Sequence, residues 1–277
     1  MTVTRFAPSP TGRLHLGHAY SALFAEAVAK EHGGDFLLRI EDIDVTRCRP
    51  EFVQEIIDDL SWLGIQWSGE VMFQSERSEA YSTALDQLND QGLLYPCFCT
   101  RKDIMREISA AGDAPHGSVN TRYPGTCKRL SEELRMERLA NGDSHAMRLD
   151  SRKALESVGD LQWHDLEIGA RPVCMENLGD VVLARKDIAN SYHLAVCVDD
   201  AAQGVTLVTR GVDLLESTNV HRLLQQLLGF PVPKWHHHSL IRDEKGRRFA
   251  KREGGLSLSA IRASGKNANE IRQELGF

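Results

Sequence analysis

Several kinds of segment are missing from this sequence of 277 residues. No apolar run reaches the roughly 18 residues that a membrane helix needs, and no signal peptide opens the chain. Internal repeats and low-complexity stretches are also lacking. These absences exclude a repeat protein or a membrane-spanning helix, and we expect a cytoplasmic monomer with no membrane partner. The length suits one large domain, or one domain with a sizeable insertion.

Positive charge is scarcer than negative charge. Lysine and arginine total 33 and aspartate and glutamate total 39, so the formal net charge is −6. A protein with this balance should not coat nucleic acid at random, and any RNA contact must come from a local basic face. One candidate is the Gly-containing loop at 242–252, although a charge run is most often a solvated surface. Its cations are Arg242, Lys245, Arg247, Arg248, Lys251 and Arg252.

Strand and helix patterns alternate from the start of the chain. Val3–Phe6 is expected to form a strand flanked by apolar residues, and Asp35–Ile40 has the pattern of a buried strand in a parallel sheet. Helices are expected at 18–31, at 50–63 with proline in the first turn, and at 75–91 with Ser75 as the opening residue. This alternation predicts a doubly wound α/β domain with a Rossmann-type core.

The pattern changes at Leu94, where a segment rich in Gly, Asp, Asn and Ser begins. A short charged helix is expected at 131–139. Strand–helix alternation then resumes near Val181, with segments at 181–184, 192–198 and 205–209 and a helix at 218–228. We predict an insertion between two halves of one nucleotide-binding sheet. The predicted boundaries are 1–93 and 181–240 for the core, 94–180 for the insertion, and 241–277 for a loop and short C-terminal helices.

The segment Arg5–His18 holds the strongest functional pattern. A strand runs into a turn with Pro and Gly, and a helix then opens with His15 and His18. Where a strand end meets a helix N-terminus, backbone N–H groups and the helix dipole favour a phosphate. Gly17 leaves room for a base or ribose, and both histidines can hydrogen-bond phosphate oxygens. The alternative is a buried turn with two incidental histidines.

A second set of residues has the chemistry to hold an acidic amino acid. Arg5 and Arg210 stand at strand ends, Glu41 follows a strand, and Tyr192 begins an apolar segment. A zwitterionic acidic substrate needs a cation for its side-chain carboxylate, an anion for its ammonium and a hydroxyl for orientation, and the planar guanidinium suits a carboxylate. Each of these residues taken alone is equally explained as a salt-bridge partner or a half-buried tyrosine.

Six cysteines occur in a chain without an export signal, so we do not expect a disulfide framework. Cys97, Cys99 and Cys127 lie within a loop-rich stretch and predict one structural zinc, which needs a fourth ligand. His116 is the generic candidate for that ligand, and three buried free cysteines are the alternative to a metal. The other cysteines, Cys48, Cys174 and Cys197, are expected to be small core residues.

Three adjacent histidines, His236, His237 and His238, suggest a metal site at first sight. On an extended segment they point to alternate faces and cannot converge on one ion. We predict a strand beside the nucleotide site.

Four segments resemble those of class I glutamyl-tRNA synthetases, in the same order. They are residues 5–18, whose His-Leu-Gly-His is similar to the HIGH motif, and residues 39–44, 191–195 and 210–211. The basic loop stands where that family carries its KMSKS loop. Lys251 corresponds to the second lysine, while Arg248 and Ala250 depart from the motif. The resemblance covers nearly the whole catalytic core, to about residue 252.

The resemblance implies roles for individual residues. Catalytic roles fall to His15, His18 and Lys251, and the same three residues with Gly17 would bind ATP, together with Mg²⁺. The implied L-glutamate site consists of Arg5, Phe6, Ala7, Pro8, Ser9, Glu41, Tyr192 and Arg210. A tyrosine four residues before the last cysteine is similar to that of glutamyl-queuosine synthetases. This match implies one structural Zn²⁺ per chain held by Cys97, Cys99, Tyr123 and Cys127.

Glutamyl-tRNA synthetases continue beyond this core with a helical anticodon-binding region, which we do not expect here. A core of this kind with the Cys-x-Cys and Tyr-x3-Cys cluster resembles the glutamyl-queuosine tRNA(Asp) synthetases. The implied activity is ATP-dependent activation of L-glutamate, followed by its transfer to queuosine at the wobble position of tRNA(Asp). The alternatives are a minimal glutamyl-tRNA synthetase acting on a tRNA 3′ end, a non-catalytic RNA-binding paralogue, and another HxGH nucleotidyltransferase.

Overall fold

The computed structural model of the chain describes residues 1–110, 122–186, 190–241 and 256–277. The strands are β1 (Val3–Phe6), β2 (Asp35–Ile40), β3 (Met72–Phe73), β4 (Leu94–Cys97), β5 (Ala146–Leu149), β6 (Gln162–Asp165), β7 (Gly169–Pro172), β8 (Val182–Ala184), β9 (Leu207–Gly211) and β10 (Lys234–His238). The helices are α1 (Leu16–Glu31), α2 (Pro50–Trp62), α3 (Ser78–Asp90), α4 (Arg101–Ala110), α5 (Glu132–Ala140), α6 (Ser151–Val158), α7 (Tyr192–Ala202), α8 (Ser217–Leu228), α9 (Leu258–Ala263) and α10 (Ala268–Glu274).

The N-terminal third forms a parallel α/β unit. Strands β1 and β2 pair in parallel, from Val3 opposite Asp35 to Phe6 opposite Leu38, with α1 as the crossover. Both strands have the predicted bounds. The helix predicted at 75–91 starts later, at Ser78, because the Ser75 N–H and hydroxyl donate to Asp42 at 2.8 and 2.7 Å within a preceding 3₁₀ turn.

A second sheet continues the core on the other side of β1. Strands β9 and β10 are parallel, β6 pairs in parallel with β10, and β7 returns antiparallel to β6. The Thr206 N–H, just ahead of β9, donates to the Val3 carbonyl at 3.0 Å, so β9 lies beside β1. The carboxyl ends of β1, β2 and β9 are therefore brought to one edge, where α/β proteins bind ligands.

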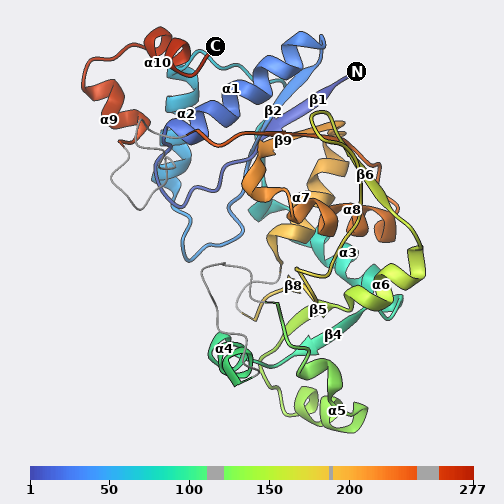
Figure 1. Cartoon of the computed structure of the whole chain (residues 1–277). Coiled ribbons are helices and arrows are strands. Elements are labelled where there is room, and N and C mark those ends of the chain that lie inside the picture. Colours follow the sequence, from blue (N-terminus) through green and yellow to red (C-terminus); the bar gives the residue numbers. More distant parts are fainter. Residues whose placement is uncertain (111–121, 187–189, 242–255) are drawn as a thin grey trace.

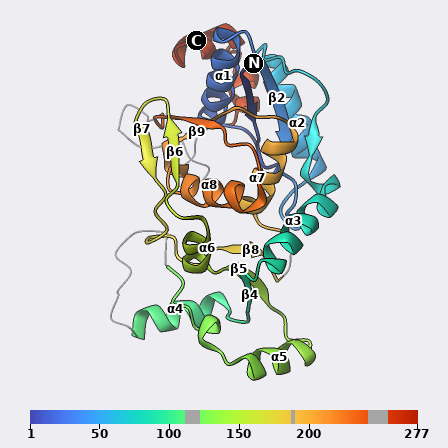
Figure 2. The same cartoon turned by 90° about the vertical axis from the view of Figure 1, so that its right-hand side faces the viewer.

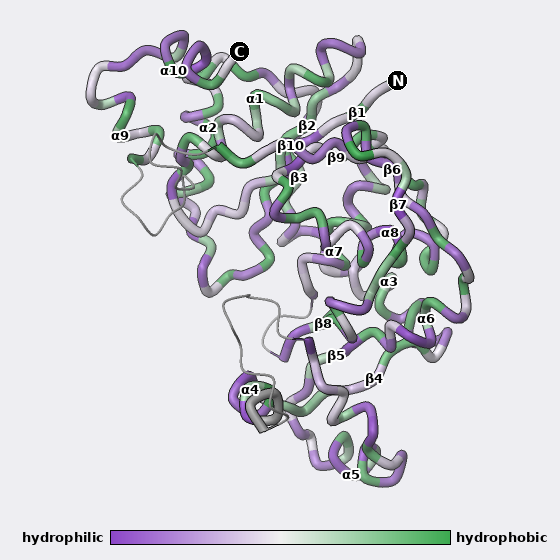
Figure 3. Tube along the Cα trace, in the orientation of Figure 1, coloured by the Kyte–Doolittle hydropathy of each residue, from purple (hydrophilic) through white to green (hydrophobic). Residues whose placement is uncertain are grey.

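A lower lobe extends away from this core (Figures 1 and 2). It is built on β4, β5 and β8, which pair antiparallel, and it carries α4 and α5. Helix α5 buries none of its residues and is largely hydrophilic (Figure 3). Strand pairing crosses the predicted segment boundaries twice, since the β6–β7 hairpin joins β10, while β8 pairs with β5.

The segment 192–198, which the sequence placed in the strand–helix alternation, forms the first turns of α7. The Ser191 hydroxyl caps the helix by accepting from the Leu194 N–H at 3.4 Å. Helix α7 packs against α3 and α8, and its residues from Leu194 to Asp200 are all buried. A helix covered on every side has a continuous apolar sequence, which periodicity alone cannot distinguish from a buried strand.

In the described part of the chain, no helix is long and apolar enough to cross a bilayer.

Candidate active site

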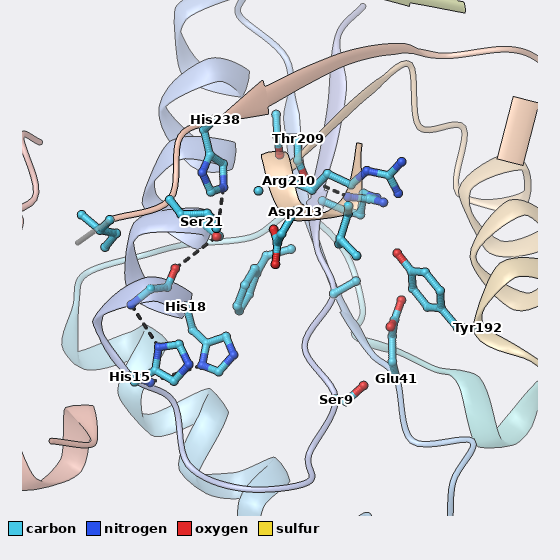
Figure 4. A pocket seen from close by; sticks show the side chains of 18 residues that line it. Ser9, His15, His18, Ser21, Glu41, Tyr192, Thr209, Arg210, Asp213 and His238 are labelled. Carbon is cyan, nitrogen blue, oxygen red and sulfur yellow. Dashed lines mark hydrogen bonds between the residues drawn. The ribbon is translucent and has the colours of Figure 1, made fainter. Parts of the chain in front are cut away.

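A cavity of about 750 Å³ opens where the carboxyl ends of β1, β2 and β9 meet the start of α1. Figure 4 shows His15 and His18 on one side of it, with Glu41, Tyr192 and Arg210 on the other. Residues implied by the resemblance that line the cavity are Arg5, Phe6, Ala7, Ser9, His15, Gly17, His18, Glu41, Tyr192 and Arg210. Pro8 does not line it, and its carbonyl instead accepts from the Glu41 N–H at 3.0 Å.

The two histidines of the N-terminal motif are held at the start of α1. His15 is the N-cap, and its Nδ1 accepts from the Gly17 N–H at 3.1 Å. The His15 N–H in turn donates to His18 Nδ1 at 3.2 Å, and the two rings stack with centroids 3.8 Å apart. Because each Nδ1 is an acceptor, the proton of each neutral ring is on Nε2. These N–H groups and the helix N-terminus suit an anion such as phosphate.

Arg5 and Arg39 share one buried carboxylate beneath the cavity. Arg5 donates to both oxygens of Asp200, at 3.0 and 3.2 Å, and to the Thr209 carbonyl at 3.1 Å. Arg39 donates to Asp200 at 2.8 Å. Asp200 on α7 thus forms ion pairs with both guanidinium groups, and Arg5 both lines the cavity and ties β1 to α7.

Glu41 lies at the end of β2 with little exposure. Its closest cation is Arg39, with 3.5 Å between Arg39 Nη2 and Glu41 Oε1. Burial raises the pKa of Glu41 to about 7, against the opposing attraction of Arg39 and Arg5. A ligand ammonium placed here would favour the ionised carboxylate.

Arg210, at the end of β9, is almost fully buried and has only neutral partners. Its Nε donates to His237 Nε2 at 3.1 Å, its Nη1 lies 3.1 Å from His221 Nδ1, and its Nη2 donates to the Thr218 hydroxyl at 2.6 Å. In the described ranges it forms no ion pair with a carboxylate. Burial lowers the pKa of Arg210, but a guanidinium stays protonated in proteins. Within the described residues, Asp200 therefore acts on Arg210 only from beyond ion-pair distance, and the site contains a guanidinium without a direct counter-ion.

Several lining residues had no role assigned from the sequence, among them Ser21, Thr209, Asp213 and His238. His238 Nε2 lies 3.0 Å from the Ser21 hydroxyl, which connects β10 to α1. The predicted histidine strand is confirmed as β10, with His236 and His238 against Phe24 and His237 directed at Asp165. Position at the end of a parallel strand was the available signal for His238 and Asp213.

The cysteine cluster lies in the lower lobe. The sulfur atoms of Cys97, Cys99 and Cys127 lie within 4.8 Å of one another, and the Tyr123 hydroxyl is 3.4 Å from Cys97 Sγ and 3.6 Å from Cys99 Sγ. Tetrahedral zinc with bonds of about 2.3 Å needs sulfur atoms about 3.8 Å apart, so this donor set fits the ion. None of the three cysteines forms a disulfide.

Cys174, the basic loop and His116 were also assigned from the sequence. Cys174 is exposed, so its assignment to the core is wrong, because the segment after β7 runs along the surface. Lys251, with Arg248 and Ala250 of the basic loop, lies outside the described residues, and so does His116.

The described strands bring a helix N-terminus and a buried arginine into one cavity at the carboxyl ends of parallel strands, which is the arrangement of α/β enzymes. Residues 1–275 match the family model described as "tRNA synthetases class I (E and Q), catalytic domain". The "Glutamyl-Q tRNA(Asp) synthetase" of Rhodobacter capsulatus is 47% identical over 99% of this chain and 100% of its own length. A "Glutamate--tRNA ligase" of Synechococcus is 39% identical over 98% of this chain, but only 57% of that protein is covered.

Structural similarity agrees with these matches. A crystal structure of a glutamate tRNA ligase from Elizabethkingia meningosepticum, in complex with its amino acid, gives a TM-score of 0.74 at 29% identity. The superposition covers 100% of this chain and 53% of that one. The chain belongs to the family of class I tRNA synthetases, and within it to the glutamyl-Q tRNA(Asp) synthetases. The resemblance inferred from the sequence motifs is thereby confirmed.

Proposed function

We propose that this protein activates L-glutamate with ATP and transfers it to queuosine at the wobble position of tRNA(Asp). The transfer step is supported by the relatives named for that activity, two of which match 96–100% of this chain and at least 81% of their own lengths. The observation that carries the glutamate step is the buried Arg210, which forms no ion pair with a described carboxylate and lies on the same side of the cavity as Glu41. An acidic amino acid would place its side-chain carboxylate at Arg210 and its ammonium at Glu41.

We assign the site residues accordingly. Arg210 binds the side-chain carboxylate of glutamate, Glu41 binds the ammonium, and the Tyr192 hydroxyl orients the substrate. The segment from Arg5 through Phe6, Ala7 and Pro8 to Ser9 forms one edge of the amino-acid site. His15, Gly17 and His18 bind ATP together with Lys251.

The chemistry needs no protein nucleophile. The α-carboxylate of glutamate attacks the α-phosphate of ATP, and the bond to pyrophosphate breaks, leaving glutamyl-adenylate. His15, His18 and Lys251 stabilise the negative charge that builds on the phosphates. Mg²⁺ bound with ATP would supply further neutralisation of that charge. A queuosine hydroxyl then attacks the activated carbonyl and releases AMP.

We further propose that residues 94–180, which form most of the lower lobe, are an inserted subdomain whose structural zinc is held by Cys97, Cys99, Tyr123 and Cys127. Four protein ligands leave no open position for water, so the ion would have a structural role only. The zinc assignment is supported by the convergence of four side chains. The thiols of Cys97 and Cys99, at the end of β4 and just after it, lie close to the Tyr123 phenol and the Cys127 thiol.

Zinc analysis tests this assignment. Purified protein should contain about one zinc per chain, and Cys99→Ser should lower both the zinc content and the melting temperature, the latter by more than about 5 °C. Cys174→Ser is the matched control, because Cys174 is exposed and lies outside the cluster. Zinc-free protein that melts like the wild type would contradict the proposal.

Charging with labelled glutamate tests the whole function. The protein is incubated with ATP and tRNA(Asp) that either carries queuosine or lacks it. We expect glutamate on the first sample only. Equal charging of both would favour the alternative, a minimal glutamyl-tRNA synthetase, while no ATP–pyrophosphate exchange in the presence of glutamate would favour a non-catalytic paralogue.

A further inference from the structure

The hydrogen bonds around Arg210 determine where the protons of its histidine partners are. Asp165, on β6, accepts from the N–H groups of Glu167 and Ile168 at 2.9 and 3.2 Å and from that of His237 at 3.1 Å. The same carboxylate lies 2.7 Å from His237 Nδ1. A carboxylate accepts only, so His237 carries its proton on Nδ1 and presents the lone pair of Nε2 to Arg210.

The position of the proton on the second histidine, His221, follows from its contact with Arg210. Arg210 has only donors, so His221 Nδ1 must accept and the His221 proton lies on Nε2. His221 Nε2 is 3.1 Å from His193 Nδ1, which accepts this proton in turn. In both cases, a neutral imidazole ring, that of His237 or His221, therefore accepts a hydrogen bond from the Arg210 guanidinium.

Charge and burial agree with these proton positions. Burial and the nearby positive charge of Arg210 lower the pKa of His193 and of His237 to about 4, and they lower the pKa of His221. The Thr218 hydroxyl is fully buried and adds a third neutral acceptor. By contrast, the buried Arg5 and Arg39 both have Asp200 as counter-ion.

We infer that His221, His237 and Thr218 are positioning residues that orient Arg210 without neutralising it, with Asp165 and His193 holding the two rings in the accepting tautomer. Three of the five guanidinium N–H groups are occupied in this way, and the guanidinium also has a side-chain hydrogen bond with Tyr192, which lines the cavity. The missing counter-charge must then come from the substrate, which selects an amino acid with an anionic side chain over its neutral amide. This inference rests on the proposed glutamate activation and names the residues that give it charge selectivity.

The test changes charge at a single atom. Asn Oδ1 is as many bonds from Cα as His Nδ1, so His221→Asn keeps a neutral acceptor facing Arg210, and His221→Asp places a carboxylate there. The two variants leave the same space. We expect His221→Asp to raise the KM for glutamate in ATP–pyrophosphate exchange at least about tenfold over His221→Asn. The KM for ATP should agree between them, and the preference for glutamate over glutamine should fall at least about tenfold.

Two further variants keep the test decisive. Thr218→Val removes one acceptor with little change of shape, and we expect it to raise the KM for glutamate at least about threefold with the KM for ATP unchanged. It decides the question if His221→Asp does not fold. His236→Asn is the matched control, because His236 is the neighbour of His237 on β10 and its partner is the exposed Glu167.

The outcomes separate this inference from the proposed function. Equal glutamate KM values for His221→Asp and His221→Asn, or a parallel rise in the KM for ATP, would overturn the inference and leave glutamate activation in place. If His221→Asp does not fold, an unchanged KM for glutamate in Thr218→Val would likewise overturn the inference and leave glutamate activation in place. Wild-type exchange driven by a neutral amino acid instead of glutamate would overturn both.

Discussion

Removal of the 3′-terminal adenosine from queuosine-bearing tRNA(Asp) is expected to leave glutamate transfer intact, whereas an unmodified transcript with a complete 3′ end is expected to accept none. In our proposal the anticodon loop enters the cavity, in the place that an acceptor end would otherwise occupy. Sequence-specific RNA recognition commonly targets an unpaired, splayed base of this kind. The measurement is labelled glutamate recovered on each RNA after incubation with ATP.

Salt dependence gives this experiment an internal check. The formal net charge is −6, so the RNA must be held by a few local cations, with the loop around Arg247–Arg252 as our candidate. Transfer to the shortened, queuosine-bearing RNA should weaken visibly as salt is raised. Glutamate on the unmodified transcript and none on the shortened RNA would be the reverse result, and it would assign the protein to 3′-end charging.

Replacement of Arg210 by alanine should reduce glutamate-dependent ATP–pyrophosphate exchange at least tenfold. A charge-assisted contact to a carboxylate contributes roughly 1.5–3 kcal/mol, and each 1.4 kcal/mol corresponds to about tenfold. Arg210→Lys should fall between wild type and alanine, because it keeps the charge and loses the planar fork. The KM for ATP should change little in both variants, since Arg210 lies across the cavity from His15 and His18.

Arg171 on β7 supplies the matched control for this substitution. It is an exposed arginine, so Arg171→Ala should exchange like the wild type. Aspartate is one methylene shorter than glutamate and should be a poor substrate, since its carboxylate cannot reach Arg210 while its ammonium remains at Glu41. Exchange driven equally well by aspartate, or retained in Arg210→Ala, would sink the assignment of the carboxylate site.

Arg5 is a less suitable target for such a test than the sequence suggests. It appeared equivalent to Arg210, since both end a strand of the core. Arg5→Ala would leave Asp200, which is almost fully buried, with Arg39 as its remaining guanidinium partner. We expect that loss to lower the stability of the protein as well as its activity.

The local sequence was sufficient for the features that depend on neighbours along the chain. The bounds of β1 and β2 follow from short segments that contain or are flanked by apolar residues and that end in polar turns. The capping of α1 by His15 and His18 involves residues two and three positions apart, so it depends on the local sequence alone, although the sequence analysis assigned these histidines only to phosphate binding. The spacing of Cys97, Cys99 and Cys127 likewise predicted a cluster of three thiols in one loop-rich stretch, and the family resemblance added Tyr123.

Only the tertiary structure decided what surrounds the two buried arginines. Asp165 and His237 are 72 residues apart, and Arg5 and Asp200 are 195 apart, so no local pattern connects them. The helical state of 192–198 also depends on packing, because α3 and α8 cover α7 and hide its periodicity. The sequence alone predicted an arginine at a strand end with affinity for a carboxylate. Packing of β6, β10 and α8 around that arginine determined that its partners are neutral and that its charge is left for a ligand.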